Sequence, residues 1–536
     1  MREFQLLIDG KDVEGDGWTY VLRASTMIRD TVGTFNLKRA LELGRHEGPV
    51  PDTVEARCAK GNREHSRQAV VAARRASREF ARFPLDVRME IVRQCHQGFI
   101  DHKDELIELM VIEGHPRRLA KWELSGMIRG SDKNTLDWHR TQFDSKFAVD
   151  GERIQLVRKP DGVVCVNPPQ NAPGSNGAMG IMALLAGNTL VVKAPHSSPM
   201  SVMYIYRNIV QPALDANGAP AGTLNIISGH AQQMVRDWIA SPDVNDILFF
   251  GGSDIGLKIG ADCVAAGKKP VLELSGNDGL VVWEDADLSA AAKALSECFY
   301  GSAQICMVPK YALVHPRVAE EFSAELLDIV QEIRPGYPET EHTLLSPVLK
   351  ADQFYDYLGE AREFGAEMLC GGSRVDVSGK PKEDGLFFEP TVIRMSGLSN
   401  ARKLSCVTEE TFFPLLPIVV ATPAEEADLA ESMIEFLNEN RYGLRNSLWT
   451  RSEHVGRIFA EGITNGGQLK INSSHIGFHS YLSTHGGTGR TGGPFGELNY
   501  VALRTSHLQG IAWGTGEVHP IDQLVHGERN LGTQTP

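Results

Sequence analysis

A cysteine stands alone in "GSAQICMVPK" (301–310), between a polar turn and the start of an apolar strand. The stretch holds no disulfide partner, second metal ligand or histidine, so Cys306 is either a small core residue or a nucleophile whose helpers lie elsewhere. The other cysteines are scattered without a CxxC pair, which predicts free thiols and no zinc site: Cys58, Cys95, Cys165, Cys263, Cys298, Cys370 and Cys406.

A carboxylate and an amide are the next candidates for chemistry. Glu273 lies between two leucines at the end of the apolar run in "VLELSGND" (271–278), where desolvation raises a carboxyl pKa and suits it to general-base work. A structural salt bridge is the alternative. Asn171, in "NPPQNAPG" (167–174), could donate to an oxyanion, or it could be a turn residue favoured beside prolines.

Several segments could bind a dinucleotide. In "FFGGSDIG" (249–256), Gly252, Ser253 and Gly256 belong to a turn that would let N–H groups and a helix N-terminus approach a pyrophosphate. The stretch is not the G-x-G-x-x-G fingerprint, so an ordinary βα turn fits it equally well.

Two further strand ends carry cofactor candidates. "TLVVKAPHSSP" (189–199) presents Lys193 and His196 where polar groups commonly face a ligand, although a solvated loop is the alternative. Gly229 ends the apolar run "LNIISG" and joins this set. Glu410 and Phe412 precede a strand in "EETFFPLLP", where a solvated acidic pair and a core aromatic are the simpler interpretation.

The elements that must position these residues alternate along the chain. From 162 to 283, short runs apolar on both faces alternate with helical stretches, which predicts an α/β fold with a doubly wound parallel sheet. Residues 62–140 have a helical pattern, and a second alternating region follows at 310–472. Two strands are expected in 152–167, joined by Lys-Pro-Asp-Gly. The segment 43–62 and the tail from 516 look inserted or loose.

Composition excludes several partners. The 536 residues and 58.8 kDa require two or three domains, and the formal charge of −14 disfavours nucleic acid and anionic membranes. The first residues lack the apolar core of a signal peptide, and the longest apolar run (177–187) is too short to cross a bilayer. Together with the free thiols, this predicts a cytoplasmic protein.

The order of the candidates identifies a family resemblance. It runs Asn171, Lys193, the 252–256 turn, Glu273, Cys306, Glu410 and Phe412, and it resembles the order in the NAD(P)-dependent aldehyde dehydrogenase superfamily from about residue 5 to 510. "LELSGN" is similar to the family's E-L-G-G-K box, "GSAQIC" to its G-Q-x-C box and "EETFFP" to its E-E-I-F-G-P. "NENRYGLRNSLWT" resembles its N-x-x-x-Y-G-L-x-x-x-V-W-T.

The chain also departs from the family pattern. The family's P-W-N-F-P is here residues 169–173, which keep the amide and replace both aromatics, and its Phe-Thr-Gly-Ser is here residues 250–253. The glutamate that follows the strand-end lysine in many NAD-using members is here His196.

The resemblance implies an aldehyde-dehydrogenase-like architecture. A Rossmann-like dinucleotide-binding domain would comprise residues 1–145 and 164–275, and an α/β catalytic domain residues 276–495. A β oligomerisation arm and C-terminal tail would comprise 146–163 and 496–536, so a homodimer or homotetramer is expected.

The resemblance also implies the chemistry. The Cys306 thiolate would attack an aldehyde, Asn171 would hold the oxyanion, NAD or NADP would accept hydride, and Glu273 would activate water to hydrolyse the thioester. Lys193 would bind the adenosine ribose, Ser253 the pyrophosphate and Glu410 the nicotinamide ribose, with Gly229, Gly252, Gly256 and Phe412 completing the cofactor contacts. Because His196 lacks the glutamate's repulsion for the 2′-phosphate, NADP should be accepted at least as well as NAD.

Two alternatives stand beside this interpretation. A CoA-acylating relative would pass the thioester to coenzyme A, but such enzymes typically lack the glutamate found here as Glu273. A non-catalytic structural relative is the other. The aldehyde itself stays open: Phe478 and Tyr481 could suit an aromatic or long apolar substrate or simply pack in the core, and Arg445 and Arg490 could bind a carboxylate or be solvated.

Overall fold

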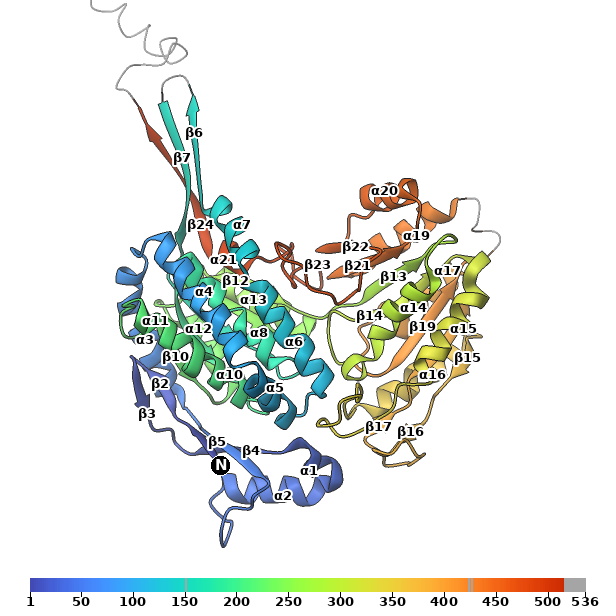
Figure 1. Ribbon diagram of the computed structural model, residues 1–536, viewed down its shortest axis with the longest axis horizontal. Coiled ribbons are helices and arrows are strands. Elements are labelled where there is room, and N and C mark those ends of the chain that lie inside the picture. The colour runs from blue at the N-terminus through green and yellow to red at the C-terminus, as the bar shows by residue number, and fades with distance from the viewer. Residues whose placement is uncertain (150–151, 423–424, 426–427, 515–536) are drawn as a thin grey trace, which may run out of the picture.

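The computed structural model describes residues 1–149, 152–422, 425 and 428–514. Two α/β lobes, each built on a seven-stranded sheet, lie side by side, with a small N-terminal sheet below the first lobe (Figure 1). A three-stranded arm projects from the first lobe away from both sheets. Within these residues, no helix is long and apolar enough to cross a membrane.

The first sheet has the order β12-β11-β8-β9-β10-β2-β3. Its parallel strands are β8 (Val163–Asn167), β9 (Thr189–Lys193), β10 (Leu224–Ile227), β11 (Asp246–Phe250) and β12 (Lys269–Glu273), and β2 (Leu6–Ile8) and β3 (Lys11–Val13) add an antiparallel edge. The predicted doubly wound sheet is confirmed. The strand order reverses at β8, because β9 and β10 extend the sheet on one side of it and β11 and β12 extend it on the other. A ligand crevice is expected at the carboxyl ends of the strands at this point.

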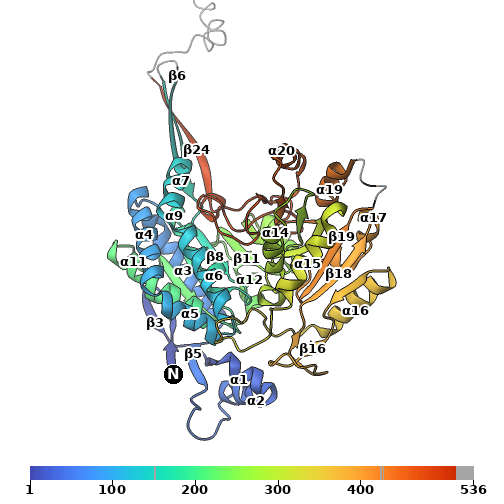
Figure 2. The same ribbon diagram turned by 45° about the vertical axis from the view of Figure 1, so that its right-hand side comes forward.

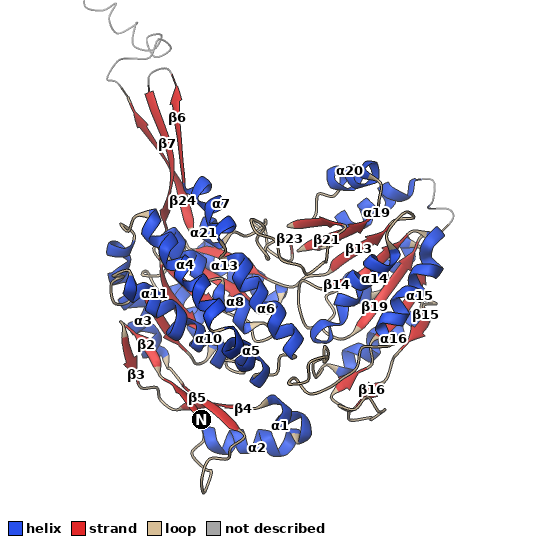
Figure 3. Ribbon diagram, viewed as in Figure 1, coloured by secondary structure: helices blue, strands red, loops and turns tan. Residues whose placement is uncertain are grey.

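Apolar residues on both faces of this sheet explain why helices cover both faces. Val164 and Val166 of β8 pack in one buried cluster, whereas Val163 and Cys165 pack in another. The helices, blue in Figure 3, are α3 (Arg63–Phe80), α4 (Leu85–Asp101), α5 (Lys103–Ile112), α6 (Arg117–Gly130), α7 (Lys133–Phe143), α8 (Pro173–Ala178), α9 (Ile181–Ala186), α10 (Met200–Ile205), the π-helix η1 (Tyr206–Val210), α11 (Gln211–Ala216), α12 (Ala231–Ala240) and α13 (Ser253–Ala265).

The second sheet has the order β15-β18-β19-β14-β13-β21-β22. Its strands are β15 (Glu367–Cys370), β18 (Thr391–Ser396), β19 (Leu415–Val420), β14 (Pro309–Val314), β13 (Asp278–Val282), β21 (Arg445–Trp449) and β22 (Gln468–Ile471), all parallel except the β15–β18 pair. Its helices are α14 (Leu288–Ser296), α15 (Ala319–Val330), α16 (Ala351–Glu363), α17 (Leu398–Ala401), α18 (Ser405–Thr408), α19 (Leu429–Asn438) and α20 (Glu453–Gly462), with 3₁₀ turns η2 (Glu297–Ala303) and η3 (Pro316–Val318).

The arm is an antiparallel sheet of β6 (Asp144–Val149), β7 (Glu152–Pro160) and β24 (Ser506–Trp513), the last preceded by α21 (Val501–Arg504) (Figure 2). The two strands predicted around Lys-Pro-Asp-Gly are present, but they do not pair with each other: β7 belongs to the arm and β8 to the first sheet. Gly162, at φ +137°, makes the turn between them. Minor pairs are β16 (Arg374–Val375) with β17 (Phe387–Phe388) and β20 (Tyr442–Gly443) with β23 (Thr488–Gly489).

The N-terminal sheet corrects one expectation. Residues 43–62 were expected to be inserted or loose, yet β5 (Val54–Ala59) is the central strand between β1 (Arg2–Phe4) and β4 (Trp18–Leu22), beside α1 (Ala24–Arg29) and α2 (Thr31–Glu42). Val54, Ala56 and Cys58 of β5 are buried, and this inward face holds the strand in place. The expected loose tail from 516 lies outside the described residues.

Candidate active site

Two cavities meet at Cys306. The larger, of about 400 Å³, is lined by Lys193, Gly252, Glu273, Glu410 and Phe412, and the smaller, of about 110 Å³, is lined largely by apolar side chains. Cys306, Asn171 and Asn176 line both. The structure therefore brings the predicted nucleophile, amide and general base into one place, with different surroundings on its two sides.

The strand ends explain this convergence. Asn171, Lys193, Gly252 and Glu273 follow or end β8, β9, β11 and β12, so they gather at the carboxyl edge of the first sheet, where α/β proteins bind ligands. Cys306 precedes β14, and Glu410 and Phe412 precede β19, so these three come from the amino edge of the second sheet. The site lies where the two edges face each other.

The loop before Cys306 has a strained backbone. Gly301, Ser302 and Ala303 have φ of +60°, +57° and +62°, a left-handed conformation that costs energy for residues other than glycine. Buried Lys310 holds the loop, because its ammonium donates to the carbonyls of Ala303 (2.7 Å) and Ile305 (3.0 Å) as well as to Thr411. These bonds fix the main chain on which the thiol is carried.

Asn171 lies against the same loop. Its Nδ2 donates to the carbonyl of Gln304 at 2.9 Å, two residues before Cys306. The second N–H of this amide has no partner in the described part of the chain, so it can donate to an oxygen that develops charge beside the thiol.

Glu273 is a buried carboxyl that accepts hydrogen bonds from two uncharged donors. Its Oε2 accepts from the Gly486 N–H at 2.8 Å and its Oε1 from Asn499 Nδ2 at 3.0 Å. Burial raises its pKa to about 8, and the two donors offset part of that shift. No salt bridge to Glu273 is present among the described residues, so the alternative of a structural ion pair does not apply.

The surroundings of Cys306 favour the protonated thiol over the thiolate. Burial is the largest cause that raises its pKa, to about 12, followed by the Glu410 and Asp278 carboxylates, whereas the Lys310 and Arg445 cations lower it. Formation of the Cys306 thiolate therefore depends on how the charges of these neighbours are balanced when ligands fill the two cavities.

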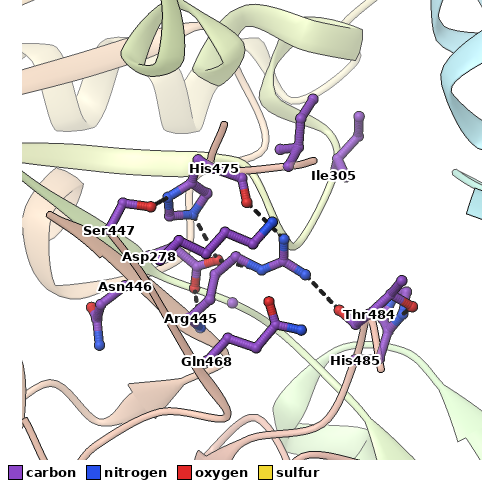
Figure 4. Close-up of polar contacts among 12 residues, drawn as sticks. Asp278, Ile305, Arg445, Asn446, Ser447, Gln468, His475, Thr484 and His485 are labelled. Atoms are coloured by element: carbon purple, nitrogen blue, oxygen red, sulfur yellow. Dashed lines mark hydrogen bonds and ion pairs between the residues drawn. The ribbon is translucent and has the colours of Figure 1, made fainter. Parts of the chain in front are cut away.

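Arg445 belongs to a buried polar network (Figure 4). Its guanidinium donates to the carbonyls of His475 (2.8 Å) and Thr484 (2.5 Å), and its Nε lies 3.9 Å from Asp278. It is 2% exposed, so the interpretation of a solvated arginine is wrong. Arg490, the other candidate for a substrate carboxylate, forms an ion pair with Asp254.

The same network contains serine, histidine and aspartate in contact. Ser447 Oγ lies 2.7 Å from His475 Nδ1, and His475 Nε2 lies 3.3 Å from Asp278 Oδ2. All three side chains are at most 1% exposed and line neither cavity. Their burial leaves them without access to a substrate in either cavity.

The larger cavity suits a dinucleotide. Lys193 is only 4% exposed, burial lowers its pKa to about 8, and its ammonium has no hydrogen-bond acceptor within the described ranges. A buried unpaired cation is costly and is relieved by a ligand that supplies hydroxyl or phosphate oxygens. Gly252 lines the cavity at the N-terminus of α13, which favours a phosphate, and Glu410 accepts from the Gly276 N–H at 2.8 Å.

Four predicted cofactor residues do not line this cavity. His196 is exposed beyond Lys193, and Ser253 donates its hydroxyl to the Arg490 carbonyl at 2.7 Å. A side chain at Gly229 would collide with the Gly61 carbonyl, and one at Gly256 with Leu274. These glycines allow close packing of backbone and helix.

Several residues of the site were not predicted from the sequence. Lys310 stands in the apolar run "PKYALV", where a lone charge could have signalled a buried role. Gly276 is needed because a side chain there would collide with the Cys306 carbonyl. Asn499 lies 226 residues from Glu273 in the sequence, and no local pattern connects the two.

Comparison with known proteins gives consistent results. The family model described as "Aldehyde dehydrogenase family" matches residues 44–504. A 3,6-anhydro-alpha-L-galactose dehydrogenase of Vibrio sp. (strain EJY3) is 29% identical over 478 residues, 86% of this chain and 94% of that protein. A D-glyceraldehyde dehydrogenase (NADP(+)) of Thermoplasma acidophilum is 27% identical, covering 86% of this chain and 92% of that protein.

A solved structure shows the same fold. The NAD-dependent aldehyde dehydrogenase from Sinorhizobium meliloti superposes with a TM-score of 0.78 at 22% identity, covering 97% of this chain and 96% of that one. The predicted fold class is thereby confirmed. The chain belongs to the aldehyde dehydrogenase family and is an NAD(P)-dependent enzyme that oxidises an aldehyde to the carboxylic acid.

Proposed function

We propose that Cys306 is the nucleophile of this oxidation and that Asn171 and Glu273 act beside it. The observation that carries the proposal is that Cys306 and Asn171 line both cavities, so one thiol can contact an aldehyde in the smaller and a nicotinamide in the larger. The thiolate sulfur bonds to the aldehyde carbon, and the oxyanion receives the Asn171 N–H.

The thiohemiacetal then loses its carbon-bound hydrogen as hydride, the C=O bond re-forms, and a Cys306 thioester results. NAD or NADP, when bound in the larger cavity, supplies the acceptor for that hydride. Lys193, Gly252, Glu410 and Phe412 would hold it, as residues that line this cavity. Ser253 and His196 would act at its margin.

Glu273 completes the cycle as general base. It takes a proton from water, the hydroxyl bonds to the acyl carbon, and the thiolate leaves to give the carboxylic acid. Its place in the larger cavity beside Cys306 supports hydrolysis over transfer to coenzyme A. Coenzyme A added to the wild type should yield no acyl-CoA, and formation of acyl-CoA at the rate of aldehyde consumption would contradict this assignment.

Cys306→Ala tests the nucleophile. Oxidation should fall below about one per cent of the wild-type kcat, while cofactor affinity, measured by fluorescence titration, stays within about twofold. Cys370→Ala is the matched control, since Cys370 is also only partly buried but lies on β15, remote from both cavities. Loss of activity in Cys370→Ala but not in Cys306→Ala would contradict the assignment of Cys306 as the nucleophile.

We further infer that NADP is accepted at least as well as NAD. His196 lacks a carboxylate, and besides burial the cations of Lys38, Lys60 and Lys193 lower its pKa, which is partly offset by Glu42. A 2′-phosphate placed there would meet positive surroundings and would raise the pKa of His196 in turn.

His196→Glu should lower the ratio of kcat/KM for NADP over NAD at least tenfold, because a carboxylate repels the phosphate. His454→Glu, on exposed α20, is the control and should leave the ratio unchanged. A wild type that prefers NAD tenfold or more, or an unchanged ratio in His196→Glu, would rule out the proposal.

We also propose a homodimer or homotetramer in the cytoplasm. Outer strands β6 and β24 of the arm are open edges that a second copy can extend. All eight cysteines are free thiols, which suits a reducing compartment.

A further inference from the structure

The cavity on the far side of Cys306 from the cofactor residues has an uncharged wall. Among the described residues that line it there is no arginine, lysine, aspartate or glutamate. Many of its large side chains are apolar, among them Trp122, Met127, Met179, Met182, Phe478 and Leu482. Two histidines line it, but burial lowers the pKa of His139 to about 4 and that of His485 to about 3, so both are neutral at physiological pH.

Most polar groups of the wall are engaged by the protein itself, whereas His485 Nε2 and Asn499 Oδ1 have no hydrogen-bond partner among the described residues. The Trp122 indole N–H donates to the Ile476 carbonyl (3.1 Å), and the Tyr500 hydroxyl donates to the Tyr481 carbonyl (2.6 Å). Ser131 donates to the Met127 carbonyl at 2.7 Å. These side chains therefore present carbon surface to a ligand.

The cation beneath the cavity is also engaged. Arg445 does not line it, and its two terminal nitrogens donate to the carbonyls of His475 and Thr484. A substrate carboxylate in the cavity would thus lose its hydration without gaining a counter-charge, which is costly in a buried site.

The mouth of the cavity is also largely apolar. Tyr481 and Leu482 line it and are 49% and 45% exposed, so an apolar rim faces solvent. Deeper in, Trp122 and Phe478 stack with ring centroids 5.0 Å apart and form a continuous aromatic wall. Tyr481 is therefore not a core residue, and Phe478 lines the cavity while it packs on Trp122.

We propose that the substrate is a neutral apolar aldehyde, with an alkyl chain or aromatic ring that enters past Leu482 and packs along Trp122 and Phe478 to reach Cys306. The proposal rests on the proposed function of Cys306 and specifies its substrate class. Aldehydes that carry a carboxylate, a quaternary ammonium group or several hydroxyls are excluded as preferred substrates.

Steady-state kinetics with a graded series test the proposal. From propanal to hexanal, kcat/KM should rise about fourfold for each methylene that is added and buried. Hexanal should exceed 5-oxopentanoate, betaine aldehyde and glyceraldehyde by at least a hundredfold. A charged or polyhydroxylated aldehyde that equals hexanal would overturn the substrate class while leaving the role of Cys306 intact.

A binding measurement separates the two proposals, because it needs no turnover. Calorimetry with Cys306→Ala should show hexanamide binding at least tenfold more tightly than adipic acid monoamide. Absence of turnover with every aldehyde, together with this preference, would overturn the proposed function alone. Equal or reversed affinity would overturn the substrate class.

Leu482→Arg provides a gain of function. Its exposed position tolerates a charge, and a cation at the mouth should raise kcat/KM for 5-oxopentanoate relative to hexanal at least tenfold. Val71→Arg, an exposed apolar position on α3, is the matched control and should not change this ratio. An unchanged ratio in Leu482→Arg would contradict the placement of the substrate past that residue.

Discussion

Charged side chains from several parts of the chain surround the Cys306 thiol. Asp278 begins β13, Lys310 belongs to β14, Arg445 begins β21 and Glu410 precedes β19, while Glu273 ends β12 in the other lobe. Burial raises the thiol pKa most, the Glu410 and Asp278 carboxylates raise it further, and the Lys310 and Arg445 cations oppose them. The reactivity of one residue thus depends on the sign of its buried neighbours.

Arg445→Gln and Asp278→Asn should shift the Cys306 pKa in opposite directions. Loss of the cation raises the pKa, and loss of the carboxylate lowers it. At pH 9, alkylation of Cys306 by iodoacetamide, followed by peptide mass spectrometry, should slow about threefold or more in the first variant and accelerate similarly in the second. Arg88→Gln controls for loss of a buried arginine elsewhere. A shift of the same sign in both variants would indicate a purely structural network.

The pKa of Glu273 predicts the pH dependence of hydrolysis. Burial raises it to about 8, so below that pH the carboxyl is protonated and cannot accept a proton from water. Thioester hydrolysis should therefore rise as pH increases through about 8 and then level off. Single-turnover measurement of acid release between pH 6 and 10 would show this limb in the wild type. A flat profile would contradict the role of Glu273 as base.

The candidate catalytic residues were recognisable in the sequence, whereas the residues that support them were not. Cys306, Asn171 and Glu273 stand in short motifs whose order along the chain is distinctive. Asp278 and His475 meet across 197 residues in a buried network, and each looks ordinary in its local sequence. Sequence patterns report local geometry, whereas the charges that tune the thiol come from contacts formed only by folding.

At the scale of elements, the strained loop before Cys306 and the ends of the strands position the residues of the site. The carboxyl end of β12 leads into Gly276, which packs directly under the Cys306 carbonyl. Lys310 ties the loop to the segment before β19 through the Thr411 carbonyl. The loop that carries Cys306 is therefore held from both lobes.

Gly276→Ala should displace this loop and lower kcat at least a hundredfold, because its new methyl group would overlap the Cys306 carbonyl. Gly359→Ala in α16 is the control, since no atom lies near its added methyl group. The control should be as active as the wild type and more stable by about 0.5–1 kcal/mol in urea denaturation. Full activity of Gly276→Ala would show that the loop does not depend on this contact.

Some of the strands were predicted from the sequence, and others were missed. Most parallel strands of the two sheets were identified, because they are apolar runs between turn signals. β18 was missed, and β13, expected with the strands of the first alternating region, belongs to the second sheet. Strands β1, β2 and β3 span three residues each, too short for any periodicity to appear. β5 was missed because its neighbours in sequence are polar and irregular.

At the scale of the whole molecule, the arm has little contact with either lobe beyond its base (Figure 1). Its outer strands expose apolar side chains, with Phe147 on β6 and Leu508 on β24 each more than half exposed. Such open edges ordinarily aggregate unless another chain covers them.

The double variant Phe147→Lys/Leu508→Lys should therefore form a smaller assembly than the wild type in light scattering. Both cavities lie within one chain, so kcat per site should stay within about threefold. Val71→Lys, on the exposed face of α3, serves as control. An unchanged molar mass would contradict the pairing of arms between copies.

The most direct test of the account is a single mixing experiment with Glu273→Gln, NADP and hexanal. The variant should release about one NADPH per active site in a rapid burst and then turn over very slowly, because acylation proceeds and hydrolysis does not. Peptide mass spectrometry after the burst should locate one hexanoyl group on Cys306. Wild-type turnover without a burst, or an acyl group on any other cysteine, would contradict the assignment of Cys306 and Glu273.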